Sequence, residues 1–291
     1  MNQNNIINNR NSAKQAPLVK AFKSNLQTLN YSKGMVNQSE LSVAQYLSYL
    51  KANQIKLEAT NTAIIADYFK YLQHKPNEKR AGGLTAAYIQ KHRQSLILFY
   101  DYLRNTKVVK VPIIHFPTIK KEQEKTIKVL DRNSIDRLFK ACDSSLIGTR
   151  NKAMLALYYG CGLRKQEGIL LNVEDLDLDK AELIVKRTKT NRQRRVPLSN
   201  HTKEILEDYL YNSREKLIPS DQSEQAVLVT QTGKRLSGST AVYMFQSLQK
   251  IAKINGHYGL HALRHSIATH LLQSGMPLES IALFLGHRSI D

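Results

Sequence analysis

The sequence has no tryptophan, only two cysteines and no glycine-rich P-loop. Cys142 and Cys161 lack the paired spacing of a metal site, and a reducing cytoplasm is the simplest setting for two unpaired thiols. Without a P-loop, a nucleotide-driven motor is not indicated. These absences predict a chain that carries out its function without a structural metal or a disulfide framework.

Long apolar runs are also missing. The best run, residues 154–163, is far shorter than the roughly 20 residues that cross a bilayer. Six of the first twelve residues are asparagine, so the start cannot supply the apolar core of a signal peptide. We expect residues 1–16 to be a disordered polar tail, and we expect a cytoplasmic protein with no membrane partner.

Acidic residues are scarce. The 291-residue chain has 24 of them against 43 lysines and arginines, which gives a net charge of +19. With 42% hydrophobic residues the chain can bury a core, so its charge concerns its partners and not disorder. Double-stranded DNA is the expected partner, because each cation placed on a phosphate releases condensed counterions. A membrane surface is the weaker alternative, since no basic amphipathic anchor stands out.

Helical spacing dominates residues 17–112. Apolar residues recur at three- and four-residue steps, for example at Val43, Tyr46, Leu47 and Leu50. Residues 60–62 are typical of a helix cap, and a long helix is expected from Thr85 to about residue 104. No strand pattern occurs here, so we predict a helical N-terminal domain. Residues 113–128, with Pro117 and a charged stretch, are predicted to be a linker.

Residues 129–291 predict a second domain of mixed elements. Segments 182–187 and 194–198 flank a polar turn and suggest a β-hairpin, and residues 226–229 suggest a third strand. Helices are expected around them, including one that starts near Ser134 and one that ends near Phe284. The predicted fold class is mainly α with a small antiparallel sheet.

Arg164 stands where a glycine turn enters a helix. Free backbone N–H groups and the helix dipole favour an anion there, and an arginine fork can hold two phosphate oxygens. Glu167 lies on the same face and is expected to orient the arginine or to cap the turn. The alternative is an ordinary surface arginine paired with a glutamate.

His261 and Arg264 have the i, i+3 spacing that places two side chains on one helical face. An imidazole that transfers protons near neutral pH would then lie beside a second guanidinium. A capping histidine with a solvated arginine is the alternative. No carboxylate or cysteine completes a metal ligand set here.

Six basic residues and no acidic one occupy the predicted hairpin turn, namely Lys186, Arg187, Lys189, Arg192, Arg194 and Arg195. Their mutual repulsion favours a DNA-binding hairpin over a plain solvated loop. A lysine at the tip can also deliver a proton, whereas an arginine stays charged. In the N-terminal domain, the candidate DNA contacts are Lys79, Arg80, Lys91 and Arg93, and base contacts cannot be told from phosphate contacts. Near the end, Gly286 fits a helix C-terminal cap with His287 just beyond it.

Taken in order, these segments resemble the tyrosine recombinase (phage integrase) family, and its Xer-type members most. The resemblance runs through residues 162–167, 188–198, 260–270 and 285–287, and covers roughly residues 130–291. The helical region is similar to the SAM-like core-binding domain of that family, and the second region to its catalytic domain. No cofactor is implied.

The resemblance implies that a tyrosine attacks a DNA phosphate and forms a 3′-phosphotyrosyl link. It assigns Arg164 and Arg264 to the nonbridging oxygens and Lys189 to the leaving 5′-oxygen as general acid. It also implies that His261 handles a proton and that His287 supports the phosphate. Glu167 matches a supportive acidic position. A homotetramer on two DNA sites is the family expectation.

The nucleophilic tyrosine of the family would lie about nine residues after the Leu285-Gly-His287 motif, beyond Asp291. We therefore expect a catalytic domain that is incomplete at its C-terminus, and a 291-residue chain that binds DNA without cutting it. The alternative is a catalytically silent regulator or recombination antagonist of the same fold. The codons that follow Asp291 would separate the two, because only the recombinase requires a tyrosine there.

Overall fold

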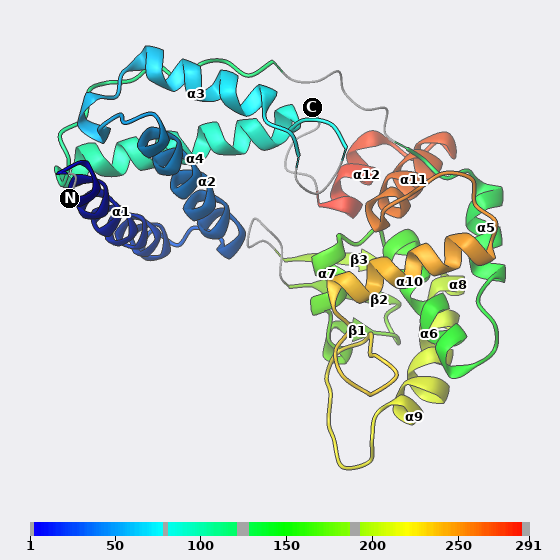
Figure 1. The fold of residues 1–291 in the computed structure, drawn as a ribbon. Helices are drawn as coiled ribbons and strands as arrows, with labels where there is room; N and C mark the ends of the chain where they lie inside the picture. Colours follow the sequence, from blue (N-terminus) through cyan, green and yellow to red (C-terminus); the bar gives the residue numbers. More distant parts are fainter. Residues whose placement is uncertain (1–2, 78–80, 121–127, 187–192, 287–291) are drawn as a thin grey trace. The chain divides into compact units, whose positions relative to one another are not determined.

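The computed structural model describes residues 3–77, 81–120, 128–186 and 193–286, with only the backbone given for residues 3–15. The chain divides into two compact units, Met1–Lys125 and Thr126–Asp291 (Figure 1). The boundary lies inside the segment 113–128 that the sequence predicts as a linker. A mainly helical chain with one small antiparallel sheet confirms the predicted fold class.

The described residues of the first unit form four α-helices, α1 (Gln3–Thr28), α2 (Lys33–Ala52), α3 (Thr62–His74) and α4 (Ala86–Thr106), and a 3-10 turn at Leu57–Ala59. Side-chain caps start α3 and α4, as the sequence predicts. Asn61 accepts a hydrogen bond from the backbone of Ile64, and Thr85 accepts one from Tyr88. Each such cap satisfies an N–H group that the helix itself leaves unpaired.

Helix α1 begins at Gln3, which differs from the disordered tail expected for residues 1–16. Asparagine and glutamine cost only a few tenths of a kcal/mol per residue in a helix relative to alanine. A segment with few apolar residues can therefore extend a helix whose C-terminal half is already packed. That packed half contributes Phe22 and Leu26 to the core.

Aromatic residues fill the core of the first unit, together with a buried chain of hydroxyl groups. The Tyr46 and Tyr100 hydroxyls lie 2.7 Å apart, and Tyr100 donates to Thr60 Oγ1 at 2.8 Å. Because a buried polar group without a partner is costly, this chain fixes α2, α4 and the start of α3 in one register. The helical periodicity predicts the apolar positions but not these pairings.

Part of the predicted linker packs on the first unit. Arg93 Nε donates to the Pro117 carbonyl at 2.8 Å, and the backbone N–H of His115 donates to Thr62 Oγ1 at 3.2 Å. Phe116 packs edge-on against Tyr100. Residues 113–119 are therefore held against α3 and α4 by specific contacts.

His92 on α4 is fully buried, and its Nδ1 lies 3.3 Å from the Tyr68 hydroxyl. Burial, with a smaller contribution from the charge of Lys75, lowers the pKa of His92 from 6.5 to about 4. The folded unit therefore binds this proton more weakly than the unfolded chain. Stability that is present above pH 6.5 should fall as the pH drops from 6.5 towards 4, by roughly 3 kcal/mol.

The measurement is hydrogen–deuterium exchange of α4 peptides at several pH values, corrected for intrinsic rates. Protection of α4 should decrease between pH 6.5 and pH 4 in the wild type. In His92→Gln, which keeps a polar group for Tyr68 but does not titrate, this part of the pH dependence should disappear. An unchanged pH dependence in His92→Gln would contradict the assignment to His92.

The second unit begins with α5 (Arg132–Lys140), capped by Asp131, and α6 (Leu146–Leu155), which continues into a π-helical turn at Ala156–Gly160. Short α7 (Lys165–Leu170) follows, then the sheet, α8 (Asn200–Glu207), α9 (Glu215–Leu217), α10 (Gly238–Ile251), α11 (Leu260–Gln273) and α12 (Leu278–Leu285). Residues from all these helices join one apolar core or pack against it. This core holds the ends of α7, α11 and α12, which carry the site, in fixed positions.

The sheet contains three antiparallel strands in the order β1 (Leu176–Asp177), β2 (Glu182–Val185) and β3 (Arg194–Pro197). The predicted hairpin is confirmed, but the third strand is β1 and not residues 226–229. Those residues are fully buried, and their described pairing is limited to isolated bridges. A short apolar run signals burial, and periodicity alone does not specify a strand.

Candidate active site

The turn into α7 is built for close approach. Gly162 has φ +58°, and a Cβ there would lie 2.6 Å from Leu285 on α12. Arg164 is the N-cap residue of α7, and Glu167 Oε2 accepts from the Arg164 backbone N–H at 2.8 Å. Glu167 Oε1 accepts from Arg164 Nη1 at 2.8 Å. Glu167 therefore does both things that the sequence left open, because it caps the turn and orients the arginine.

Three arginines from distant parts of the second unit surround the Glu167 carboxylate. Arg194 on β3 donates from Nη1 and Nη2 to its two oxygens at 3.0 and 2.9 Å. Arg264 on α11 has its Nη1 3.9 Å from Oε2. The side chains of Glu167 and Arg264 are each 3% exposed, whereas that of Arg164 is 34% exposed. Arg164 is therefore the member of this cluster that solvent, or a ligand, reaches most readily.

The arginine cluster shifts the ionisation of its members. Burial alone would raise the pKa of Glu167, but hydrogen bonds from Arg194 and from the Arg164 backbone lower it to about 2. Burial lowers the pKa of Arg264 to about 10, and the nearby positive charge of Arg164 adds to this effect. Near pH 7 the cluster therefore contains one carboxylate and three guanidinium groups, a surplus of positive charge suited to an anion.

The same three arginines bind the last carbonyl groups of α12. Arg194 Nε donates to the Phe284 carbonyl at 3.2 Å, and Arg264 Nη2 donates to that of Leu285 at 2.6 Å. Arg164 Nη2 donates to the Gly286 carbonyl at 3.2 Å. Helix ends leave such carbonyls unpaired and partly negative, so cations are stabilising there.

Gly286 closes α12 with φ +67°, which confirms the predicted C-terminal cap. A Cβ at this position would lie 2.8 Å from Arg194 Cδ, so glycine also lets the arginine approach. The residue that follows, His287, lies outside the described residues. The contacts of the arginines hold the described backbone as far as Gly286.

On α11, Arg264 is buried, so the alternative of a solvated arginine at this position is wrong. Arg264 Nη1 donates to the Gly162 carbonyl at 2.6 Å, which ties α11 to the turn before α7. His261, three residues earlier, is exposed, and its ring packs edge-on against that of His265 with centroids 4.5 Å apart. The structure thus brings Arg164 and Arg264 together and leaves His261 at the surface of the same helix.

Comparison with known proteins shows the family. Residues 128–291 match the model of the phage integrase family. The chain belongs to the phage integrase family. It is 32% identical over 273 residues to tyrosine recombinase XerD of Oceanobacillus iheyensis, covering 87% of this chain and 91% of that protein. It is 33% identical over 212 residues to tyrosine recombinase XerC of Bacillus pumilus, covering 72% and 69%.

Solved structures show the same fold. The XerH site-specific recombinase bound to palindromic difH substrate, a post-cleavage complex, matches with a TM-score of 0.73 at 20% identity, over 92% of this chain and 78% of that one. A λ integrase (75–356) dimer bound to a COC′ core site matches with a TM-score of 0.66 at 16% identity, over 94% and 95%. At these identities the likeness concerns the fold alone.

In this phage integrase family member, two basic residues of the hairpin have carboxylate partners that could not be predicted from the turn sequence. Lys186 Nζ lies 3.0 Å from Glu174 and 2.7 Å from Asp175, and Arg195 pairs with Glu182 at 2.8 Å. Part of the expected repulsion is therefore relieved within the protein. Arg187, Lys189 and Arg192 lie outside the described residues.

Arg194 differs most from its expected role as a DNA contact, since its side chain is 9% exposed and bound to Glu167. A signal for this was present in the sequence. Side chains alternate along a strand, so Arg194 shares the face of Val196, two residues on, and Val196 is apolar. Arg195 takes the opposite face, where it is exposed.

The candidate DNA contacts of the first unit also differ in exposure. Lys91 is exposed on α4, while Arg93 is half-buried and bound to the Pro117 carbonyl. Lys79 and Arg80 lie outside the described residues. Lys91 is therefore the described candidate with a charge open to a partner.

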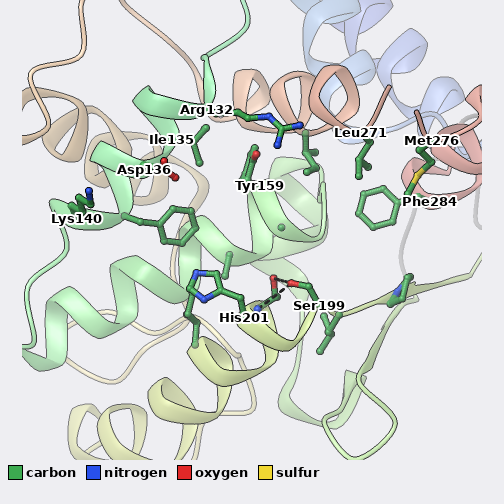
Figure 2. Close-up of a pocket in the computed structure, with 18 residues that line it drawn as sticks. Arg132, Ile135, Asp136, Lys140, Tyr159, Ser199, His201, Leu271, Met276 and Phe284 are labelled. Carbon is green, nitrogen blue, oxygen red and sulfur yellow. Dashed lines mark hydrogen bonds between the residues drawn. The ribbon is translucent and has the colours of Figure 1, made fainter. Parts of the chain in front are cut away.

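A cavity of about 800 Å³ is lined by residues of α5, α8, α11 and the end of α12 (Figure 2). Phe284 contributes its side chain to this cavity, while its carbonyl accepts from Arg194. Tyr159, Leu271 and Met276 add apolar lining, and Tyr159 is hydrogen-bonded to His270 Nδ1 at 2.9 Å. The last turn of α12 therefore contacts both the cavity, through the Phe284 side chain, and the arginine cluster, through its carbonyl groups.

Within the described parts of the chain, no group of three or more His, Cys, Asp or Glu residues is arranged to hold a metal ion. Over the same residues, no helix has both the length and the apolar character needed to cross a membrane.

Proposed function

We propose that this chain is a site-specific DNA recombinase whose Arg164 and Arg264 hold the nonbridging oxygens of one DNA phosphate. The supporting observation is that these two guanidinium groups, from α7 and α11, meet at the Glu167 carboxylate. Preorganised cations stabilise the charge that develops on phosphorus, because they need no reorganisation during the reaction. A site that already collects positive charge is suited to this role.

In the proposed reaction, a tyrosine hydroxyl attacks phosphorus and its proton leaves to a base. The bond to the 5′-oxygen breaks, and Lys189 gives that oxygen a proton. The covalent 3′-phosphotyrosyl link conserves the bond energy, so a 5′-hydroxyl of a partner strand can reverse the step without a cofactor. His261 and His287 are proposed to transfer a proton and to support the phosphate.

We further propose that residues 1–291 bind DNA without forming this link. All fourteen tyrosines fall within the described residues, and Tyr158, whose hydroxyl contacts the start of α7, is unsuited to attack. Its hydroxyl donates to the Lys165 carbonyl at 3.0 Å, and burial raises the pKa of Tyr158. The expectation that the nucleophile lies beyond Asp291 stays a prediction.

A nicked suicide substrate, which traps the covalent intermediate, tests both proposals. The 291-residue chain should give no covalent protein–DNA band, whereas a chain extended to carry a tyrosine at the expected position should give one. A band from the 291-residue chain would show that the nucleophile is among its own tyrosines. Binding of the extended chain without a band would favour the silent regulator.

DNA binding itself should depend steeply on salt, because the chain carries a net charge of +19. If about six or more phosphates are contacted, the affinity for a duplex site should fall by on the order of 1,000-fold between 50 and 200 mM salt. Fluorescence anisotropy at several salt concentrations gives the slope. Lys91→Gln should reduce that slope by about one contact if Lys91 binds a phosphate, and an unchanged slope would remove Lys91 from the interface.

The assembly on DNA is also a proposal. The XerH structure contains a palindromic substrate and the λ integrase structure a dimer on a core site. By analogy we propose that the full-length protein acts as a homotetramer on two sites. Light scattering of the protein with a duplex that carries one or two sites would count the protomers.

A further inference from the structure

Arg194 is a basic residue that lies inside the site instead of on its surface. The alternation of β3 turns it to the same side as buried Val196, opposite Val185 of β2. Its neighbour Arg195 points the other way, and that side chain is 68% exposed. Two adjacent arginines therefore differ completely in environment, although they carry the same charge.

The contacts of Arg194 join three elements. Both of its terminal nitrogens bind the two oxygens of Glu167 on α7, and Nε binds the Phe284 carbonyl at the end of α12. Such a two-point pair fixes the plane of the carboxylate as well as its position. Arg164 then donates its own two hydrogen bonds, from the backbone N–H and from Nη1, to a carboxylate that is already held in place.

The charges give Arg194 a second effect. Arg164, Arg264 and Glu167 alone carry a net charge of +1, and Arg194 raises it to +2 by neutralising the buried glutamate. A phosphodiester approaching a phosphorane-like transition state gains negative charge on its nonbridging oxygens. The pairing of Arg194 with Glu167 therefore leaves the charges of Arg164 and Arg264 available to the phosphate.

We propose that Arg194 is a positioning residue that acts through Glu167, holding Arg164 in the orientation that binds a DNA phosphate. This inference rests on the proposed function. Without Arg194, the Glu167 carboxylate is free to turn both oxygens towards Arg164, and it cancels part of the charge meant for the phosphate. DNA contacts elsewhere on the chain would stay intact.

The test uses the 291-residue chain and needs no cleavage. After the bound site is mapped by footprinting, duplexes are made in which one phosphate at a time is replaced by a neutral methylphosphonate. At the phosphate held by the arginines, the wild type should lose affinity by on the order of tenfold, since charge-assisted hydrogen bonds are lost. Arg164→Ala should bind both duplexes almost equally, which identifies that phosphate.

In Arg194→Gln the ratio of the two affinities should fall from about tenfold towards one. Arg195→Gln is the matched control, because it removes the same charge from the adjacent position. It should weaken binding to both duplexes alike and keep the wild-type ratio. Arg194→Lys keeps the charge but not the two-point contact, so its ratio should lie in between and should be measurable even if Arg194→Gln does not fold.

A wild-type ratio in Arg194→Lys and in folded Arg194→Gln would overturn the inference while leaving the proposed function intact. If no phosphate of the mapped site gives a ratio above one with the wild type, the proposed phosphate clamp itself fails. Far-ultraviolet circular dichroism establishes folding of each variant. A purely structural role for Arg194 predicts equal losses on both duplexes, which the ratio separates from positioning.

Discussion

Arg164→Ala is expected to slow formation of the covalent protein–DNA link by on the order of 100- to 1,000-fold, measured in a chain that carries the nucleophilic tyrosine. Removing one preorganised donor from a developing anion has an effect of this size. Arg164 is the most exposed of the three clustered arginines, so its loss should disturb the fold least. Single-turnover cleavage of a suicide substrate gives the rate, and anisotropy gives the affinity.

Affinity for the whole site should fall by no more than about tenfold, because many other cations contact the backbone. Arg137→Ala is a suitable control, since Arg137 is exposed on α5 and its described side-chain hydrogen bond is to Ser134 of the same helix. It removes the same charge from the same unit and should cleave at the wild-type rate. Full-rate cleavage by Arg164→Ala would refute the assignment of Arg164 to the phosphate.

The second large effect is on stability. Glu167→Ala should lower the free energy of unfolding of the second unit by about 3–5 kcal/mol, because it leaves the guanidinium groups of Arg194 and Arg264 buried without their carboxylate. For a unit of this size, that corresponds to a decrease in Tm on the order of 10 °C. Differential scanning calorimetry measures it directly.

Glu182→Ala is the matched control, because its partner Arg195 is largely exposed and such pairs contribute only about 0–1 kcal/mol. A small loss in Glu167→Ala, similar to that of the control, would contradict a central role for this carboxylate. DNA bound at the cluster should offset part of the loss, since a phosphate supplies the missing negative charge.

The pH dependence follows from the lowered pKa of Glu167. In the folded chain it is about 2, below its ordinary value of 4.5, so the unfolded state takes up the proton first. The stabilisation is therefore present above about pH 4.5 and is lost as the pH falls towards 2. The stability difference between the wild type and Glu167→Gln should accordingly narrow as the pH is lowered from 5 to 3.

Much of the fold could be predicted because helices and strands each require a characteristic spacing of apolar residues in the sequence. The caps at Asn61, Thr85 and Gly286 were predictable from short local patterns, which depend on backbone groups within a few residues. The third strand was not predictable in this way. Residues 226–229 are apolar because they are buried, and an apolar run does not by itself specify a strand. The start of α1 was not predictable either, because composition indicated a tail.

In the candidate site, too, local motifs predicted some residues, and only the fold brought the others together. Arg164, Glu167 and Arg264 could be named from the sequence because they occur in short motifs. The basic side chains of the hairpin were predicted to repel one another. For Lys186 and Arg195 this prediction was misleading, because both pair with carboxylates. The acids that pair with its cations, Glu174 and Glu182 among them, lie outside the turn and reach it only through the fold.

The sequence by itself determined the helical class, the polycationic character and the family to which the motifs pointed. These properties depend on composition and on neighbours within a few residues. Only the tertiary structure decided which cations are buried against a carboxylate and which face solvent. Arg194 and Arg195 are adjacent and chemically identical, and one is buried against Glu167 while the other faces solvent. That difference arises because strand pairing and core packing, and not the identity of the residue, set the direction of each side chain.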